Sequence, residues 1–150
     1  MVTDKILVER EKRNEEIKKL LLDSDVACLK VNVPGFDKNT PTSKLLFCYF
    51  TQLLKNKGLV NYKTLSGEDG SCGLYLINNG KSYKKKFLSI EENHPLGRFI
   101  DLDVTLKNST SSLSRKKLRK CYICDKPAFY CGRTKAHTHA ELLAHMEEKT

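Results

Sequence analysis

Two aspartates lie two positions apart in a segment of alternating polar and apolar residues. Asp101 and Asp103 alternate with Ile100, Leu102 and Val104. A period of two predicts a half-buried β-strand that carries both carboxylates on one face, with their Cα atoms roughly 6–7 Å apart. Paired carboxylate oxygens are ligands that Mg²⁺ takes, usually together with phosphates and water. The pattern therefore predicts a magnesium site, and the alternative is a pair of solvated aspartates on an exposed sheet face.

A second candidate site lies near the C-terminus, where cysteines and a histidine cluster. The pattern is Cys121-x2-Cys124-x6-Cys131-x5-His137. A two-residue gap lets two thiolates and nearby backbone N–H groups surround one Zn²⁺, and four ligands complete the tetrahedron of a structural site. His139 is the alternative to His137 as the fourth ligand. The alternative to a metal site is a loop of ordinary cysteines beside a functional Arg133 and His137.

Basic residues mark two further places. Gly35 and Lys38 lie in a loop after a predicted strand, where ligands often bind in α/β sheets, although the Gly-Lys-Ser/Thr spacing of a P-loop is absent. A plain turn is the alternative. Arg10 and Arg13 lie one turn apart on a predicted helix, where such arginines usually form a solvated face.

The elements that must position these residues alternate along the chain. Apolar periodicity and capping residues predict helices over about 4–22, 42–57 and 138–149. Strands are predicted over about 25–33, 59–65, 74–77, 82–90 and 100–106. Residues Asn78-Asn79-Gly80 predict a hairpin turn, and Lys84–Lys86 are predicted on a sheet edge.

These elements predict a mixed α/β (α+β) fold in one domain over residues 1–150. Its sheet is expected to have about five or six strands flanked by helices. Residues 115–150 form a subregion with a basic run, the Cys/His knuckle and a closing helix. In that helix, Thr138 and Glu141 have capping-box spacing, and Leu142, Leu143 and Met146 are candidates for docking.

Composition and net charge limit the classes of binding partner. The 150 residues are 39% hydrophobic, enough for a core, and 27 Lys and Arg against 18 Asp and Glu give a net charge of +9. This charge favours an anionic partner, which could be nucleic acid, polyphosphate or an acidic protein. No apolar run approaches a membrane span and no signal-peptide pattern is present, so we predict a cytoplasmic protein without a membrane partner.

Several motifs together resemble one enzyme family. His94-Pro95-Leu96-Gly97-Arg98, continued by Asp101-Leu102-Asp103-Val104, resembles the signature of the citrate lyase holo-acyl-carrier-protein synthases, also called apo-citrate lyase phosphoribosyl-dephospho-CoA transferases. The resemblance extends to Leu7-Val8-x-Arg10-x-x-Arg13, to Val33–Lys38, and to Arg119–Cys124 followed by Ala128, Cys131, Arg133, His137 and Leu142. Ile100 departs from the pattern, since relatives often carry a larger aromatic residue there, and this touches packing rather than chemistry.

The resemblance implies a transferase of the nucleotidyltransferase type. Its donor would be 2′-(5″-triphosphoribosyl)-3′-dephospho-CoA, and its acceptor a serine of the apo acyl-carrier (gamma) subunit of citrate lyase. The phosphoribosyl-dephospho-CoA group would be attached through a phosphodiester, and pyrophosphate would leave. Asp101 and Asp103 would hold Mg²⁺, and one of them would double as general base. By analogy with the paired aspartates of nucleotidyltransferases, the fold is expected to be nucleotidyltransferase-like.

The same resemblance assigns residues to the phosphates of the donor. They are His94, Gly97, Arg98, Gly35, Lys38, Arg133, Arg10 and Arg13. Two other functions remain as alternatives. A zinc-knuckle nucleic-acid-binding protein would explain the charge and the cysteines, but the basic run 115–120 contains no aromatic residue for base stacking, which argues against nucleic acid as the partner. A sibling transferase would load another carrier subunit, such as that of malonate decarboxylase.

Overall fold

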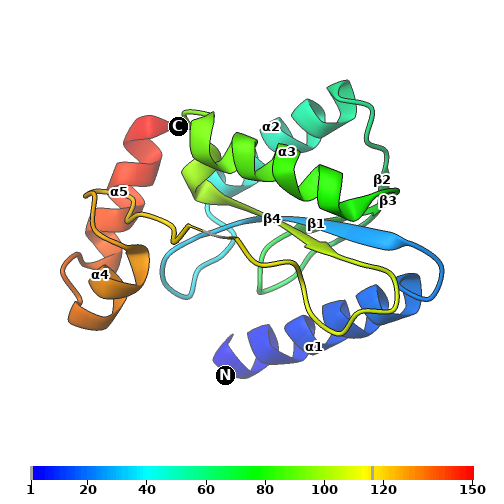
Figure 1. Ribbon diagram of the computed structural model, residues 1–150. Coiled ribbons are helices and arrows are strands. Elements are labelled where there is room, and N and C mark those ends of the chain that lie inside the picture. Colours follow the sequence, from blue (N-terminus) through cyan, green and yellow to red (C-terminus); the bar gives the residue numbers. More distant parts are fainter. Residues whose placement is uncertain (1, 116) are drawn as a thin grey trace.

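A four-stranded antiparallel sheet is the centre of the fold (Figure 1). The computed structural model describes residues 2–115 and 117–150. The strands are β1 (Asp25–Val31), β2 (Asn61–Leu65), β3 (Cys72–Ile77) and β4 (Ile100–Thr105), in the order β2-β3-β1-β4. The helices are α1 (Val2–Leu20), α2 (Pro41–Asn56), α3 (Gly80–Asn93), the 3₁₀ turn η1 (Gly97–Phe99), α4 (Ala128–Thr134) and α5 (His139–Lys149).

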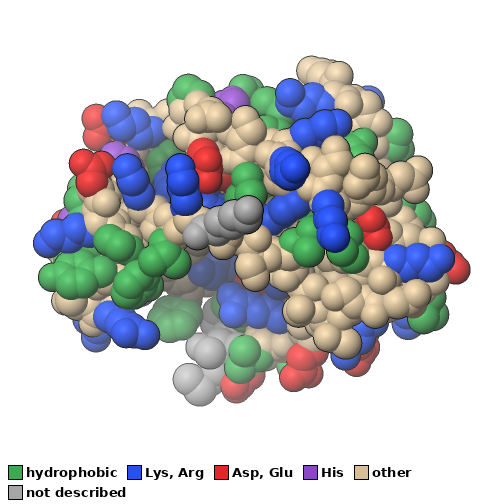
Figure 2. Space-filling view, viewed as in Figure 1, with side chains coloured by type: hydrophobic (Ala, Val, Ile, Leu, Met, Phe, Trp, Pro, Cys, Tyr) green, Lys and Arg blue, Asp and Glu red, His purple; other side chains and the backbone are tan. Residues whose placement is uncertain are grey.

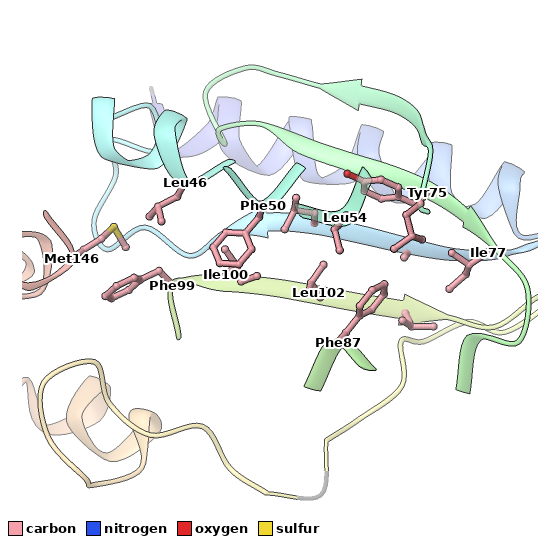
Figure 3. Packing of buried hydrophobic residues seen from close by; sticks show 14 residues of the cluster. Leu46, Phe50, Leu54, Tyr75, Ile77, Phe87, Phe99, Ile100, Leu102 and Met146 are labelled. Atoms are coloured by element: carbon pink, nitrogen blue, oxygen red, sulfur yellow. The ribbon is translucent and has the colours of Figure 1, made fainter. Parts of the chain in front are cut away.

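The helices cover the two faces of the sheet unequally. Helices α2 and α3 lie over one face, α1 lies along the other, and α4 and α5 pack at the end where β4 begins (Figure 1). The main core lies under α2 and α3, and Phe50, Phe87 and Leu102 are almost completely buried there. Met146 of α5 enters the same core beside Phe99 (Figure 3). Among the described residues, the α1 face carries a smaller cluster of Cys28, Cys72 and Leu74, which leaves room for polar side chains.

The strand predicted over 82–90 is wrong, because these residues belong to α3. Asn79, in the left-handed region at φ 58°, caps that helix by accepting a hydrogen bond from the backbone N–H of Ser82, so residues 78–80 form no hairpin turn. The buried residues of α3 follow helical spacing at Gly80, Lys84, Phe87 and Glu91. The sheet therefore has four strands instead of five or six, and Lys84 is buried in the helix instead of lying on a sheet edge.

The other predicted elements are confirmed, with bounds that shift by a few residues. Thr40 caps α2, which begins at Pro41, one residue before the predicted start. Thr138 caps α5 by accepting from the N–H of Glu141, and Met146 is fully buried as the docking residue. Helix α4 was not predicted. None of the helices in the described part of the chain combines the length and hydropathy that a membrane crossing requires.

Candidate functional site

The register of β4 places the two aspartates on the α1 face of the sheet. Asp101 is paired with Lys30 of β1, and Asp103 with Cys28. The alternate residues Ile100, Leu102 and Val104 are buried against α2 and α3. The predicted half-buried strand with both carboxylates on one face is therefore confirmed.

One cation holds the first aspartate, and the second is more exposed. Arg119 Nη1 donates to Asp101 Oδ1 at 2.5 Å, and the Asp101 side chain is 42% exposed. The pKa of Asp103 is raised, first because neighbouring protein atoms partly desolvate its carboxylate and then because Asp101 adds a like charge. A cation between the two carboxylates would relieve this repulsion.

Arg119 also fixes the turn that precedes β4. Its Nη1 donates to the Ile100 carbonyl at 2.9 Å, and its Nη2 donates to the carbonyls of Gly97 and Arg98, both at 3.1 Å. Sequence reasoning had placed Arg119 in the basic run and in the family pattern without a role. Its only signal was the family pattern, since a long-range contact with β4 leaves no local periodicity.

A buried carboxylate supports β4 from the other side. Glu91 of α3 accepts the backbone N–H of Leu102 at 2.9 Å and pairs with Arg115, and its side chain is only 3% exposed. Burial raises the pKa of Glu91, while the Leu102 N–H and the charges of Arg119 and Arg115 act in the opposite direction. Lys84 donates to the Leu102 carbonyl at 3.4 Å. The sequence analysis assigned neither Glu91 nor Lys84 to this site.

A second carboxylate on the α1 face gathers three cations. Asp69 accepts from Arg13 at 2.8 Å, from Lys30 at 2.6 Å and from Arg10 at 3.2 Å, and its side chain is 3% exposed. Burial raises the pKa of Asp69, but the hydrogen bonds from Lys30, Arg13 and Arg10 outweigh it and lower the value to about 2. Glu9 accepts the Asp69 N–H at 2.7 Å and fixes this loop on α1. Arg10 and Arg13 are thus brought to the face of the aspartate pair, already paired with Asp69.

The loop after β1 runs beside this cluster. Lys38 Nζ donates to the Val33 carbonyl at 2.6 Å, and burial, followed by the nearby charge of Arg10, lowers its pKa. Gly35 has φ +81°, a backbone conformation that favours glycine, and a Cβ there would lie 3.6 Å from His139 Nδ1. The loop therefore extends from the Asp69 cluster to the start of α5.

His94 and Gly97 lie on the other side of η1. His94 Nδ1 accepts the Leu96 N–H at 3.0 Å, which leaves Nε2 as the donor to the Tyr49 hydroxyl at 2.9 Å. Burial lowers the pKa of His94, consistent with this neutral form. A Cβ on Gly97 would come within 2.2 Å of the Ile90 carbonyl, so only glycine fits. The structure uses both residues to shape the turn, and it does not bring His94 to the aspartate face.

A cavity of about 520 Å³ opens where η1, the loop after β1 and the C-terminal helices meet. Arg98, Tyr122 and Asn32 form one wall. The Arg98 guanidinium lies 4.4 Å from the centre of the Tyr122 ring, and the Tyr122 hydroxyl donates to the Asn32 carbonyl. Figure 2 shows Lys and Arg side chains within and around a hollow between the C-terminal helices and α1.

Arg119 links the cavity residue Arg98 to the aspartate pair, because it donates to the Arg98 carbonyl and to Asp101. Burial and the charge of Arg119 lower the pKa of Arg98, and the charges of Tyr122 and Asp101 act in the opposite direction. Arg98 therefore lies within electrostatic range of Asp101. Arg133 is exposed on α4 over the Phe129 ring and is not among the residues that line the cavity.

The predicted cysteine and histidine cluster is assembled. The ligand atoms of Cys121, Cys124, Cys131 and His137 all lie within 4.8 Å of one another, so His137 rather than His139 completes the group. Cys124 Sγ and Cys131 Sγ are 3.5 Å apart, and the N–H of residue 123 donates to Cys121 Sγ. The sequence prediction of this cluster is confirmed as a geometric group that could hold a metal.

The polar surroundings of the cluster suit a metal site. His137 Nδ1 lies 3.8 Å from Glu141 Oε2, while the buried Nε2 has no hydrogen-bond partner among the described residues. Burial raises the pKa of Cys121, but the N–H groups of Ile123 and Cys124 outweigh it, so the net shift is downward. The pKa of Cys131 is raised to about 11 by burial and by the adjacent thiol of Cys124. Crowded thiols that resist ionisation together are stabilised as thiolates when a metal binds.

Comparison with known proteins gives a family match for this chain. The family model described as apo-citrate lyase phosphoribosyl-dephospho-CoA transferase matches residues 1–150. The protein named CitXG of Leuconostoc mesenteroides subsp. cremoris is 33% identical over 149 residues, which cover 91% of this chain and 32% of that protein. A probable apo-citrate lyase phosphoribosyl-dephospho-CoA transferase of Streptococcus pyogenes serotype M18 is 30% identical over 149 residues, covering 89% and 76% of the two chains.

A third relative matches over a shorter segment. The protein of Vibrio cholerae serotype O1 (strain M66-2), also named a probable apo-citrate lyase phosphoribosyl-dephospho-CoA transferase, is 38% identical over 73 residues, or 45% of this chain and 39% of that protein. The chain thus spans between about a third and two fifths of the length of the CitXG and Vibrio relatives.

Proposed function

Because the chain belongs to the apo-citrate lyase phosphoribosyl-dephospho-CoA transferase family, we propose that it loads the apo acyl-carrier (gamma) subunit of citrate lyase. The donor is 2′-(5″-triphosphoribosyl)-3′-dephospho-CoA. A serine hydroxyl of the carrier attacks the phosphorus next to the ribosyl group, a new phosphodiester forms, and pyrophosphate leaves. The family match over the whole chain carries this proposal, and the aspartate pair supplies the chemistry it needs.

Asp101 and Asp103 are the residues that would hold Mg²⁺. Their fit to a divalent cation rests on two carboxylates that share one strand face, and on the like-charge repulsion that raises the pKa of Asp103. When bound, Mg²⁺ neutralises the charge of the triphosphate and of the leaving pyrophosphate. Asp103, with its raised pKa, is the better candidate to accept the serine proton, while Arg119 fixes Asp101.

Cations around the pair would bind the phosphates. Arg119 and Lys30 lie beside Asp101, and Arg98 belongs to η1, the turn immediately before β4. Arg10 and Arg13 already pair with Asp69. They would therefore attract the phosphates by their positive charge rather than by direct contact. Phosphate binding stays a prediction for five further residues, which are Gly35, Lys38, His94, Gly97 and Arg133. The net charge of +9 suits a polyphosphate donor and an acidic carrier.

The Cys/His cluster is proposed to hold a structural Zn²⁺. Three thiols and one imidazole match the ligand set of closed tetrahedral sites, and the unpartnered His137 Nε2 is the atom that would complete it. Zn²⁺ would keep the thiols ionised and hold residues 121–137 together. The nucleotidyltransferase-like fold and the cytoplasmic location stay predictions.

The decisive experiment follows the carrier by intact mass spectrometry. Incubation of the protein with Mg²⁺, the donor and apo carrier should add one phosphoribosyl-dephospho-CoA group to the carrier. Asp101→Asn and Asp103→Asn should each lower the rate at least about a hundredfold, the scale expected when a group that handles developing charge is lost. Asp23→Asn, the same change at an exposed position after α1, is the matched control.

Three outcomes would contradict parts of the proposal. Full activity of either site variant would remove the metal assignment. Modification of the carrier of another lyase or decarboxylase, with none of the citrate lyase carrier, would identify a sibling transferase. Salt-dependent binding of nucleic acid without any carrier modification would favour the nucleic-acid-binding alternative.

A further inference from the structure

The cavity of about 520 Å³ has the size of a small-molecule site and has no part in the chemistry at the aspartates. We infer that this cavity binds the dephospho-CoA portion of the donor, while the triphosphoribosyl portion extends to Asp101 and Asp103. This inference rests on the proposed function for the identity of the ligand, and on the walls of the cavity for its location.

The cationic side chains of the cavity favour an anion. Arg98 and Lys135 line it and no carboxylate does, while Cys121, Cys131 and His137 of the Cys/His cluster form an adjoining part of the wall. In the part of the chain that the structure describes, no aspartate or glutamate forms an ion pair with Lys135 or Arg98. Arg98 Nη1 is buried and has no hydrogen-bond partner there. Dephospho-CoA carries a diphosphate that these donors could bind.

The remaining walls are partly apolar. Tyr122 presents its aromatic ring, and Pro34 and Leu142 add aliphatic surface. The Tyr122 hydroxyl donates to the Asn32 carbonyl, and its ring packs edge-on against Phe99 at 5.0 Å between centroids, so this wall is fixed before a ligand arrives. Such surfaces suit an adenine ring and a pantetheine chain.

One residue connects the cavity to the aspartates. Arg119 holds Asp101 through one nitrogen and the carbonyls of Gly97 and Arg98 through the other. The side chain of Arg98 then lines the cavity. A donor with two separate anionic groups can therefore contact both sides of this junction, with its dephospho-CoA diphosphate near Lys135 and its triphosphate near Asp101.

The probe for this inference is dephospho-CoA itself, which lacks the triphosphoribosyl group. Isothermal titration calorimetry of the full protein should detect its binding. Lys135→Gln should raise the dissociation constant about tenfold, because one charge-assisted hydrogen bond is lost. Lys135→Arg should retain most of the affinity. Lys126→Gln is the matched control, since Lys126 is exposed over the Tyr130 ring and does not line the cavity.

Asp101→Asn separates this inference from the proposed function. It should bind dephospho-CoA as tightly as the unaltered protein while losing carrier modification. If the protein modifies the carrier but Lys135→Gln and Lys126→Gln bind dephospho-CoA equally well, the cavity inference is overturned and the proposed function stands. If dephospho-CoA binds in a Lys135-dependent way but no carrier is modified, the cavity inference stands and the transfer reaction fails.

Discussion

The sheet body, residues 2–106, and the C-terminal segment, residues 117–150, are held together by different forces. The sheet body buries large side chains from several elements in one core, with Phe50, Leu54 and Leu102 at most 1% exposed. In the C-terminal segment, the buried hydrophobic residues are Cys121, Cys131 and Met146 alone among those described. Two of these three are candidate metal ligands, and the third is buried in the core of the sheet body.

This contrast shows how a small segment can carry part of a binding site. The apolar surface that it buries is too small to offset the conformational entropy of about thirty ordered residues, at about 1–2 kcal/mol for each backbone. A bound metal and the docking of α5 would supply the missing stabilisation. The cavity lies between these two regions, so its shape depends on both.

Removal of the metal should cause the largest loss of structure, and this loss should be confined to the C-terminal segment. The purified protein should contain one Zn²⁺, and its chelation or the change Cys124→Ser should release α4 and α5. Structural zinc sites in small peptides contribute on the order of 10 kcal/mol. Hydrogen exchange should speed up at least tenfold in residues 121–149 and change much less in β1 and β4.

Cys48→Ser is the control for this change, because Cys48 is an exposed thiol on α2. Equal loss of protection in β1 and β4 would show that the two regions do not differ as described. A metal-free protein with α4 and α5 fully protected would remove the zinc assignment.

Loss of Asp69 should be the largest effect confined to the sheet body. Asp69→Ala leaves Arg10, Arg13 and Lys30 together without their shared carboxylate, and we expect a loss of about 3 kcal/mol in the free energy of unfolding. Urea denaturation followed by circular dichroism measures it. Glu68→Ala, an exposed neighbour in the same loop, should change stability by less than about 0.5 kcal/mol.

The same residue predicts an acid dependence. Since the folded-state pKa of Asp69 is lowered to about 2, the carboxylate contributes stability above its unfolded pKa of about 3.9, and this contribution is lost as the pH falls through about 2. The contribution at neutral pH is about 2 kcal/mol. Asp69→Ala should flatten the stability profile between about pH 4 and pH 2, and an unchanged profile would contradict the ion cluster.

Met146→Ala should have a smaller effect than removal of the metal or loss of Asp69, and it should affect both regions. Removal of a fully buried methionine leaves a cavity between α5 and the sheet body, at a cost of about 2 kcal/mol. Thermal unfolding should shift downward while the zinc content stays at one ion per chain. Loss of zinc in this variant would show that docking of α5, rather than the ligands, assembles the knuckle.

Much of the fold follows from local pattern. The alternation around Asp101 and Asp103 predicted β4 and its polar face, and ligand spacing alone predicted which cysteines meet His137. The error over 82–90 has a physical cause. The buried face of α3 contains Lys84 and Glu91, so its helical spacing is invisible to a pattern of apolar residues.

The parts that sequence reasoning missed depend on distant partners. Asp69 is 56 and 59 positions from the two arginines that it binds, and Glu91 stabilises a strand through one backbone N–H. Nothing near Asp69 in the sequence marks it as different from Glu68. Such roles arise only once the sheet and α1 are assembled.

Arg119 lies two residues before Cys121, the first candidate metal ligand, and also binds Asp101. Ordering of the knuckle and ordering of the aspartate site therefore share one side chain. If zinc binding steadies Arg119, then thermodynamic reciprocity requires that occupancy of the aspartate site by donor tighten zinc binding by the same factor. The family's reaction would then be sensitive to zinc supply, although the candidate zinc ligands are distinct from Asp101 and Asp103.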